Sequence, residues 1–295
     1  MKANYYYFGE QLCNVKGCKH KAYYYDNKCG RHVLDKTNKK ALPKNPKKKE
    51  SDKLFVDARI ESAVPTKNPQ ITATKIRMMQ KPVPKEGYLL VCPNNKHGHN
   101  YGYPGDYSSL SPMKLGPTIS NKVAKNIENY HQFGKVFPQE TSNEPCKCGR
   151  PFVHNKPLPE WYITRDNGYN DPEPHRHKFP KERKNIPSHS IQDDRCYTYV
   201  ESRYFYCKQM ELLAIPKIAF QELVRLYQEG YSLDIHGYDA YEPKGTDKDS
   251  LYAHYCDSSK PFGHEMVILS MLSIENVADF PWNVYKNKYI EIYTK

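Results

Sequence analysis

The sequence predicts an α+β protein, in which a mainly helical domain with a small sheet follows a small zinc finger. Three observations lead to this prediction. Cysteine and histidine residues near the N-terminus have the spacing of metal ligands, a lysine-rich segment follows them, and the remaining chain holds short apolar runs between stretches of helical periodicity. We therefore expect a finger in residues 1–34, a basic linker in residues 35–84 and an α+β domain in residues 85–295.

The predicted finger has the pattern C-x4-C-x10-C-x2-H, formed by Cys13, Cys18, Cys29 and His32. Four such ligands on two short knuckles suit a closed tetrahedral site, so we expect structural Zn²⁺. The loop between the two pairs is too small to bury a core and would need the metal to fold. The pattern resembles the short zinc repeats, C-x4-C-x9-C-x2-H, of some algal and large-DNA-virus proteins.

The linker and the overall charge favour a polyanionic partner. The chain has 45 Lys and Arg against 33 Asp and Glu, a net charge of +12, and the segment from Lys36 to Lys53 holds eight lysines. Such a segment is too polar to bury, and its prolines exclude a long helix. We expect residues 1–53 to contact nucleic acid; the alternative is a solvated spacer that touches no phosphate.

Composition also predicts the environment of the protein. No apolar run approaches the roughly 20 residues that span a bilayer, and the N-terminus lacks the apolar core of a secretion signal. The nine cysteines are an odd number, which suits a reducing compartment better than a disulfide framework. We expect a soluble intracellular protein with no membrane partner, and the 26 tyrosines predict an interior rich in aromatic rings.

Apolar runs and periodicity predict the elements of the main domain. They are strands over residues 88–92 and 232–238, a helical pattern over 121–137 that ends near Gly134, helices over 219–230 and 265–274, a helix or strand–helix join over 197–210, and an edge strand over 289–293. Residues 138–195 hold nine prolines and little periodicity, so they predict an extended, partly ordered excursion.

A second and less specific metal site is centred on Cys146 and Cys148, which form a C-x-C pair. Its further ligands would come from distant positions, namely Cys92, His97, His99 or His154. The alternative is that these cysteines are free thiols in a reducing cell.

A polar helix face is the candidate catalytic feature. Glu128, Gln132 and Lys135 are spaced at i, i+4 and i+7, which places them on one face of a helix. Facing a cleft, the glutamate could act as acid or base on a glycosidic bond, while the glutamine holds a hydroxyl or amide of the ligand. Facing water, the same residues would form an exposed ion-paired surface.

The segments S-L-S-P-M-K-L-G-P from Ser109 and N-I-E-N-Y-H-Q-F-G-K from Asn126 resemble the NADAR family. Members of that family have a Leu-Ser-Asn opening and a helix like V-E-H-Y-x-Q-A-x-K. In this chain, Pro112 replaces the family's Asn, and Asn129 replaces its His. NADAR members act on ADP-ribose-type N-glycosides without a metal in the reaction, so the resemblance implies N-glycosidase chemistry on a nucleotide derivative.

Residues 85–282 also resemble uncharacterised proteins of giant DNA viruses and phages, through W-x3-R-x2-G, E-x-R-x2-Y-C, G-Y-D and P-F-G-H-E segments. This likeness suggests the host cytoplasm, the host nucleus or a virion as the location. The expected catalytic residues are Glu128, Lys135 and Asp239. The expected substrate-binding residues are Asn126, Gln132, Trp161, Arg165, Glu201, Arg203, Tyr238 and His264. Structural alternatives are an ion pair between Glu201 and Arg203 and a helix cap at His264.

Three hypotheses about function follow. The first is an N-glycosidase that acts on an ADP-ribose or nucleotide-derived N-glycoside, with a nucleotide-like small molecule as its ligand. The second is a non-catalytic zinc-finger protein that binds nucleic acid or is packaged in a virion. The third is a protein–protein adaptor in which the finger binds a partner.

Overall fold

A computed structural model describes residues 63–77, 81, 83, 85–95, 106–175 and 187–290 of the chain. Nearer the N-terminus it describes two short strands, β1 (Phe8–Leu12) and β2 (Lys21–Tyr23), which pair in antiparallel fashion. The finger ligands predicted from the sequence, Cys13, Cys18, Cys29 and His32, lie outside the described residues, as does the lysine-rich segment.

The predicted α+β class is confirmed, and its centre is a parallel sheet of three strands in the order β3-β10-β4. The strands are β3 (Ile71–Lys75), β4 (Tyr88–Val91) and β10 (Ser232–Gly237). Every residue of β10 is buried, as expected for the middle strand of a covered parallel sheet. The strand predictions for 88–92 and 232–238 are confirmed. The domain boundary at residue 85 is wrong, because β3 lies within the expected linker and pairs with β10.

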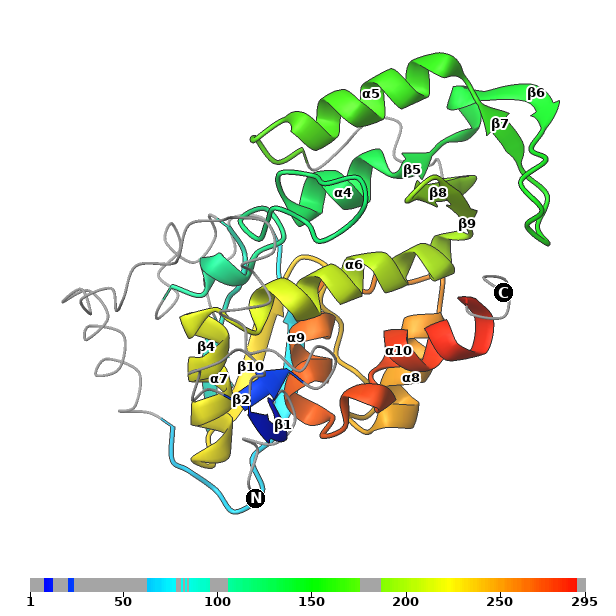
Figure 1. The fold of residues 1–295 in the computed structure, drawn as a ribbon. Helices are drawn as coiled ribbons and strands as arrows, with labels where there is room; N and C mark the ends of the chain where they lie inside the picture. Colours follow the sequence, from blue (N-terminus) through cyan, green and yellow to red (C-terminus); the bar gives the residue numbers. More distant parts are fainter. Residues whose placement is uncertain are drawn as a thin grey trace.

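Helices form the main core together with this sheet (Figure 1). They are α6 (Tyr199–Ala214), α7 (Ile218–Gln228), α8 (Lys248–Cys256), α9 (His264–Ser273) and α10 (Pro281–Tyr285). Helix α9 contacts β3, β10 and α6, and its sequence H-E-M-V-I-L-S-M-L-S suits burial on nearly every side. These residues, from 199 to 285 together with β3 and β4, are called the helical core below. The predicted helices over 219–230 and 265–274 and the join over 197–210 are confirmed.

A second region lies above α6 in Figure 1 and is called the hairpin region, residues 127–175 and 187–197. It holds the helices α4 (Ile127–Phe133) and α5 (Pro159–Asn170), the hairpin of β6 (Thr141–Pro145) and β7 (Asn155–Pro157), and an antiparallel sheet of β5 (Lys135–Val136), β8 (His189–Gln192) and β9 (Arg195–Tyr197). The excursion predicted for 138–195 is therefore wrong where the structure describes it. Two of the prolines are compatible with this regular structure, because Pro157 ends the strand β7 and Pro159 lies in the first turn of α5.

Two further predictions need correction. The helix expected over 121–137 begins only at Ile127, because the Asn126 side chain caps it by accepting from the Asn129 amide at 2.8 Å. Its end at Phe133, with Gly134 as the C-cap, agrees with the end expected near Gly134, but Lys135 consequently lies in β5 and not on the helix. Of the edge strand expected over 289–293, Tyr289 and Ile290 instead belong to a π-helix, Lys286–Ile290, that follows α10, and residues 291–293 lie outside the described residues.

Short 3₁₀ helices complete the description, at Ser108–Leu110, Pro138–Glu140 and Val277–Asp279. The expectation of a tyrosine-rich interior is confirmed. The buried tyrosines are Tyr107, Tyr130, Tyr169, Tyr197, Tyr206, Tyr231 and Tyr255. Within the described ranges, no helix combines the length and apolar character needed to cross a membrane.

Candidate metal centre and acid–base cluster

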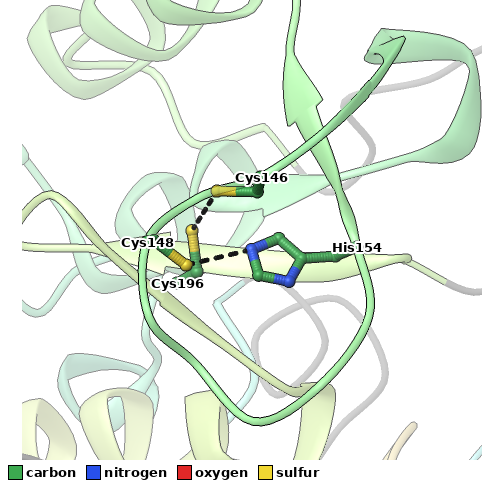
Figure 2. Close-up of side chains that lie close together, drawn as sticks. All are labelled: Cys146, Cys148, His154 and Cys196. Atoms are coloured by element: carbon green, nitrogen blue, oxygen red, sulfur yellow. Dashed lines mark hydrogen bonds between the residues drawn. The ribbon is translucent and has the colours of Figure 1, made fainter.

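Four side chains of the hairpin region form a group that could hold a metal ion (Figure 2). They are Cys146, Cys148, His154 and Cys196, and their ligand atoms all lie within 4.8 Å of one another. The first three lie between β6 and β7, and Cys196 lies on β9. We call this group the metal centre.

Two tight hairpins bring the ligands of the metal centre together. The Cys146 amide donates to the His154 carbonyl at 2.9 Å, which closes the β6–β7 loop, and Gly149 supplies a φ of 75° in its turn. The β8–β9 hairpin turns through Asp193 and Asp194, with φ of 47° and 62°, the left-handed pair typical of a type I′ turn. This turn places Cys196 beside the first loop.

The distances in the metal centre fit a tetrahedral ion. The Cys146 and Cys196 Sγ atoms are 4.0 Å apart, and the Cys148 Sγ lies 3.3 Å from the His154 Nε2. Thiolate and imidazole ligands at about 2.3 and 2.0 Å from a tetrahedral ion lie about 3.5–3.8 Å from each other. The spacing of the donor atoms therefore needs only small adjustments to accept an ion.

A carbonyl orients the histidine of the metal centre. The His154 Nδ1 lies 2.9 Å from the Phe152 carbonyl oxygen, which can only accept, so Nδ1 carries the proton. The lone pair of Nε2 is then left to face the Cys148 thiol, as a metal ligand requires. The Phe152 ring also stacks on the imidazole at a centroid distance of 4.3 Å.

The thiols of the metal centre differ in exposure: Cys196 is buried, Cys146 is half-buried and Cys148 is exposed. Burial raises the pKa of the Cys196 thiol, and the nearby Cys148 and Cys146 sulfurs raise it further. Burial likewise raises the pKa of Cys146. Three thiolates this close would repel one another, and a bound cation would stabilise them. Because the thiols must lose their protons to become ligands, metal binding here would release protons.

The predicted second metal site is partly right in its residues. Cys146 and Cys148 lie in the metal centre with His154, one of the partners considered for them. Cys92 does not, because it packs with Ile76 and Leu90 at the end of β4; His97 and His99 lie outside the described residues. Sequence reasoning missed Cys196, which follows Cys148 by 48 residues and carries no local spacing signal.

The second candidate site begins with a chain of hydrogen bonds from β5 to α4. The Lys135 ammonium donates to the Gln132 Oε1 at 3.0 Å, and the Gln132 amide donates to the Glu128 Oε1 at 2.9 Å. The Glu128 side chain is buried, whereas Gln132 and Lys135 are half-buried. The three side chains of the predicted polar face thus lie together although α4 ends before Lys135.

Electrostatics connects this chain with residues from the helical core. Burial lowers the pKa of Lys135 to about 8, while the negative charges of Glu128 and Asp239 oppose that shift. Asp239 follows β10 and is exposed. Of the three residues predicted to be catalytic, Glu128 and Asp239 therefore both lie within electrostatic range of Lys135.

A buried tyrosine lies among three carboxylates. Burial raises the pKa of Tyr206 on α6, and the charges of Glu128, Glu265 and Asp239 add to the shift. The His131 ring lies 4.8 Å from the Tyr206 ring, and burial lowers the pKa of that histidine. We call Glu128, Gln132, Lys135, Tyr206, Asp239 and Glu265 the acid–base cluster. Burial thus shifts the pKa of Lys135, His131 and Tyr206, and perturbed groups that lie together in this way are typical of functional sites.

Glu265 and Tyr206 are the members of the cluster that were not among the predicted site residues. Glu265 is fully buried in the first turn of α9, at the carboxyl end of the parallel strands, where ligands often bind in α/β sheets. A Cβ atom at Gly237 would lie 1.7 Å from the Glu265 Oε1, so any side chain at that strand end would displace the glutamate. His264, predicted to bind substrate, approaches the same carboxylate, with Nδ1 3.3 Å from Oε2. The P-F-G-H-E motif was the available signal.

The two arginines that were expected to bind phosphate instead bind the protein itself. Arg203 is buried and donates to the carbonyls of Tyr255, Asp257 and Lys260, which clamps the chain after α8. Arg165 is also buried and pairs with Asp166 at 2.9 Å and Asp194 at 3.4 Å. Their observed contacts are structural.

Glu201 and Arg203 do not form the ion pair that was the alternative for them. Glu201 accepts from the Thr198 amide at 2.7 Å in the capping box of α6 and pairs with Arg150 at 2.6 Å. Side chains two positions apart on a helix point in different directions, so Glu201 and Arg203 do not meet on α6.

The remaining predicted binding residues have mixed positions. Asn126 caps α4, and Tyr238 is half-buried against the cluster of Ile76, Leu90 and Cys92. Trp161 is buried and donates from its indole nitrogen to the Lys135 carbonyl at 2.9 Å. Trp161 therefore binds the backbone of the acid–base cluster at Lys135.

Comparison of the chain with protein-family models, with curated proteins and with solved structures finds no match.

Proposed function

We propose that the chain is a hydrolase that cleaves the N-glycosidic bond of an ADP-ribose or other nucleotide-derived substrate at the acid–base cluster. The observation that carries the proposal is the hydrogen-bonded chain from Lys135 through Gln132 to Glu128, with Asp239 within electrostatic range. The substrate class comes from the NADAR resemblance, and the chemistry comes from the side chains.

Each residue has a role that suits its surroundings. In hydrolysis, the bond between C1 of the sugar and the base nitrogen breaks, a C1–OH bond forms from water, and the water's other proton ends on the departing nitrogen. Glu128, buried and oriented by Gln132, is suited to take the proton from water or to give one to the leaving group. The Lys135 ammonium offsets negative charge on a phosphate, and the exposed Asp239 carboxylate can accept from ribose hydroxyls.

The test is release of ADP-ribose from ADP-ribosylated DNA, followed by chromatography. We expect the wild-type chain to release it and Glu128→Gln to reduce the rate by about 10²–10⁴-fold, the usual contribution of a general acid or base. The exposed Glu144→Gln is the matched control and should leave the rate unchanged. Undiminished release by Glu128→Gln would remove this carboxylate from the mechanism.

A second candidate function is non-catalytic nucleic-acid binding through residues 1–53. The net charge of +12 and the eight lysines between Lys36 and Lys53 favour it. Affinity for DNA or RNA should then fall steeply with salt and with deletion of residues 1–53. Turnover that depends on Glu128 would separate the enzyme from this alternative.

We further propose that the metal centre holds structural Zn²⁺. Three cysteines and one histidine complete a tetrahedral shell and leave no open position for a substrate, which is the pattern of structural zinc. Elemental analysis of the purified chain should show that Cys196→Ser loses about one equivalent of zinc relative to wild type. Cys256→Ser, at a half-buried cysteine outside the centre, should keep the wild-type content. Equal zinc in both variants would contradict the assignment.

A further inference from the structure

We infer that Trp161 couples the metal centre to Lys135, so that an ion bound by the cysteines and His154 holds the backbone that carries the lysine of the acid–base cluster. The inference rests on the proposed function for the role of Lys135 and for the presence of zinc. It adds a positioning residue and a second purpose for the ion.

The first link is a shared sheet. Cys196 on β9 lies opposite Ile191 on β8, and the neighbouring Ser190 lies opposite Lys135 on β5. A metal ligand and the lysine thus occupy the two outer strands of one antiparallel sheet with a single strand between them. Fixing one outer strand restrains the register of the other.

The second link is Trp161 itself. Its ring is buried in a small apolar cluster with Val136, Ile191 and Cys196. The edge of the same ring donates to the Lys135 carbonyl at 2.9 Å. One side chain therefore shares an apolar cluster with a metal ligand and also binds the backbone of the lysine.

The third link is the size of that cluster. Only four buried apolar residues form it, and the partly buried Cys146 and Phe152 pack against them. Two of these six residues, Cys146 and Cys196, are ligands in the metal centre. So small a core contributes little stability alone, and small domains of this kind commonly depend on a metal. Loss of the ion should loosen the packing around Trp161, and with it the β5 backbone.

Hydrogen exchange on the full chain tests the coupling without any substrate. The Ile191 amide donates to the Gly134 carbonyl at 2.8 Å, and the Ser188 amide donates to the Val136 carbonyl at 2.9 Å, so both amides report whether β5 is in place. We expect Cys196→Ser to speed their exchange about tenfold or more, while amides of β10 stay protected. Cys256→Ser should match wild type.

Trp161→Phe gives an independent test that does not remove a ligand. It keeps an aromatic ring but removes the indole donor, so zinc content should stay at the wild-type level while exchange of the Ile191 and Ser188 amides increases. In both Trp161→Phe and Cys196→Ser, the rate at which acetic anhydride acetylates Lys135 should also differ from the wild-type rate, as measured by mass spectrometry. Wild-type exchange at both amides in Trp161→Phe and in zinc-depleted Cys196→Ser would overturn the coupling.

The outcomes also separate this inference from the proposed function. Faster exchange in both variants, with no ADP-ribose release by wild type, would support the coupling and refute the enzyme. Release that depends on Glu128, with wild-type exchange in both variants, would support the enzyme and refute the coupling.

Discussion

The helical core and the hairpin region are stabilised in different ways. Most of the buried apolar residues belong to one cluster that fills the helical core, whereas the hairpin region contributes to two small clusters of four buried members each, one around Trp161 and one around Tyr130. The helical core can therefore rely on hydrophobic burial. The hairpin region must add other interactions, namely the metal centre and the buried pair of Arg150 with Glu201. The two proposed chemistries follow the same division, since the acid–base cluster forms where the two regions meet.

The largest expected effect comes from cutting the ionic link between the regions. Arg150 lies in the β6–β7 loop, and its pair with Glu201 at 2.6 Å is almost fully buried. Arg150→Met leaves the Glu201 carboxylate buried beside the start of α6 and should cost about 3–5 kcal/mol in the free energy of unfolding of the hairpin region.

The measurement can be confined to that region because the chain has two tryptophans, Trp161 in the hairpin region and Trp282 in the helical core. Urea unfolding followed by fluorescence in a Trp282→Phe background reports on Trp161. The exposed Lys147→Met is the control. A cost below about 1 kcal/mol for Arg150→Met would mean that the pair is no stronger than a surface one.

A cavity in the helical core should lower the stability of the chain without affecting the metal centre. Leu269 is fully buried in α9, and Leu269→Ala should cost about 2–5 kcal/mol in global unfolding free energy. Zinc content should not change, because the metal centre lies in the other region. A parallel loss of zinc from the folded variant would show that the two regions are a single cooperative unit.

The pH dependence of stability tests the site between the regions. Lys135 has its pKa lowered from 10.5 to about 8 in the folded chain. Between these values the unfolded chain keeps a proton that the folded chain has lost, so the unfolding free energy rises with pH across this window. Below pH 8 both forms are protonated, and the folded chain bears the full cost of burying the ammonium.

Lys135→Met removes that cost. Its stability relative to wild type should be most favourable below about pH 8 and should decline as pH rises from 8 to 10.5. Urea midpoints at half-unit pH steps give the measurement. The exposed Lys125→Met serves as control and should follow wild type in parallel. A pH-independent difference for Lys135→Met would show that the lysine is not desolvated.

The smallest expected effect is at the junction of β9 and α6. Thr198 accepts from the Glu201 amide at 3.3 Å as the cap of α6. Thr198→Ala should cost about 1 kcal/mol. Thr164→Ala, at an exposed helical position, is the comparison, and an equal effect of both would argue against the cap.

The sequence predicted the elements whose signals are local. The apolar runs of β4 and β10 and the periodicity of α7 and α9 identify them without reference to the rest of the chain. The C-x-C pair was likewise visible as half of a metal site.

Helix α5 was missed because its buried face is not aliphatic. Trp161, Arg165, Gly168 and Tyr169 have helical spacing and are buried, but an arginine and a glycine hide the pattern. A Cβ at Gly168 would lie 2.3 Å from the Phe133 ring, so this glycine permits the close approach of α5 to α4. Such a reason is visible only once both helices are placed.

The members of both sites that were missed come from distant parts of the chain. Cys196 reaches the metal centre through a β-hairpin, and Glu265 reaches the acid–base cluster through the start of α9. Strand β3 was missed because I-T-A-T-K has little apolar character, and only its pairing with β10 makes it a strand of the sheet. Proximity of this kind is set by topology, not by spacing.

The two-aspartate turn between β8 and β9 also determines the chemistry of the hairpin region. Asp194 is anchored by Lys122 at 3.2 Å and Arg165 at 3.4 Å, which fixes the length of the turn. A change in the length of the turn would shift every residue of β9 by one position, so a turn longer by one residue would present Arg195 to the other ligands, and a turn shorter by one residue would present Tyr197, in place of Cys196. Neither a guanidinium nor a phenol replaces the thiolate, so a one-residue insertion or deletion at this turn would abolish metal binding without altering any ligand.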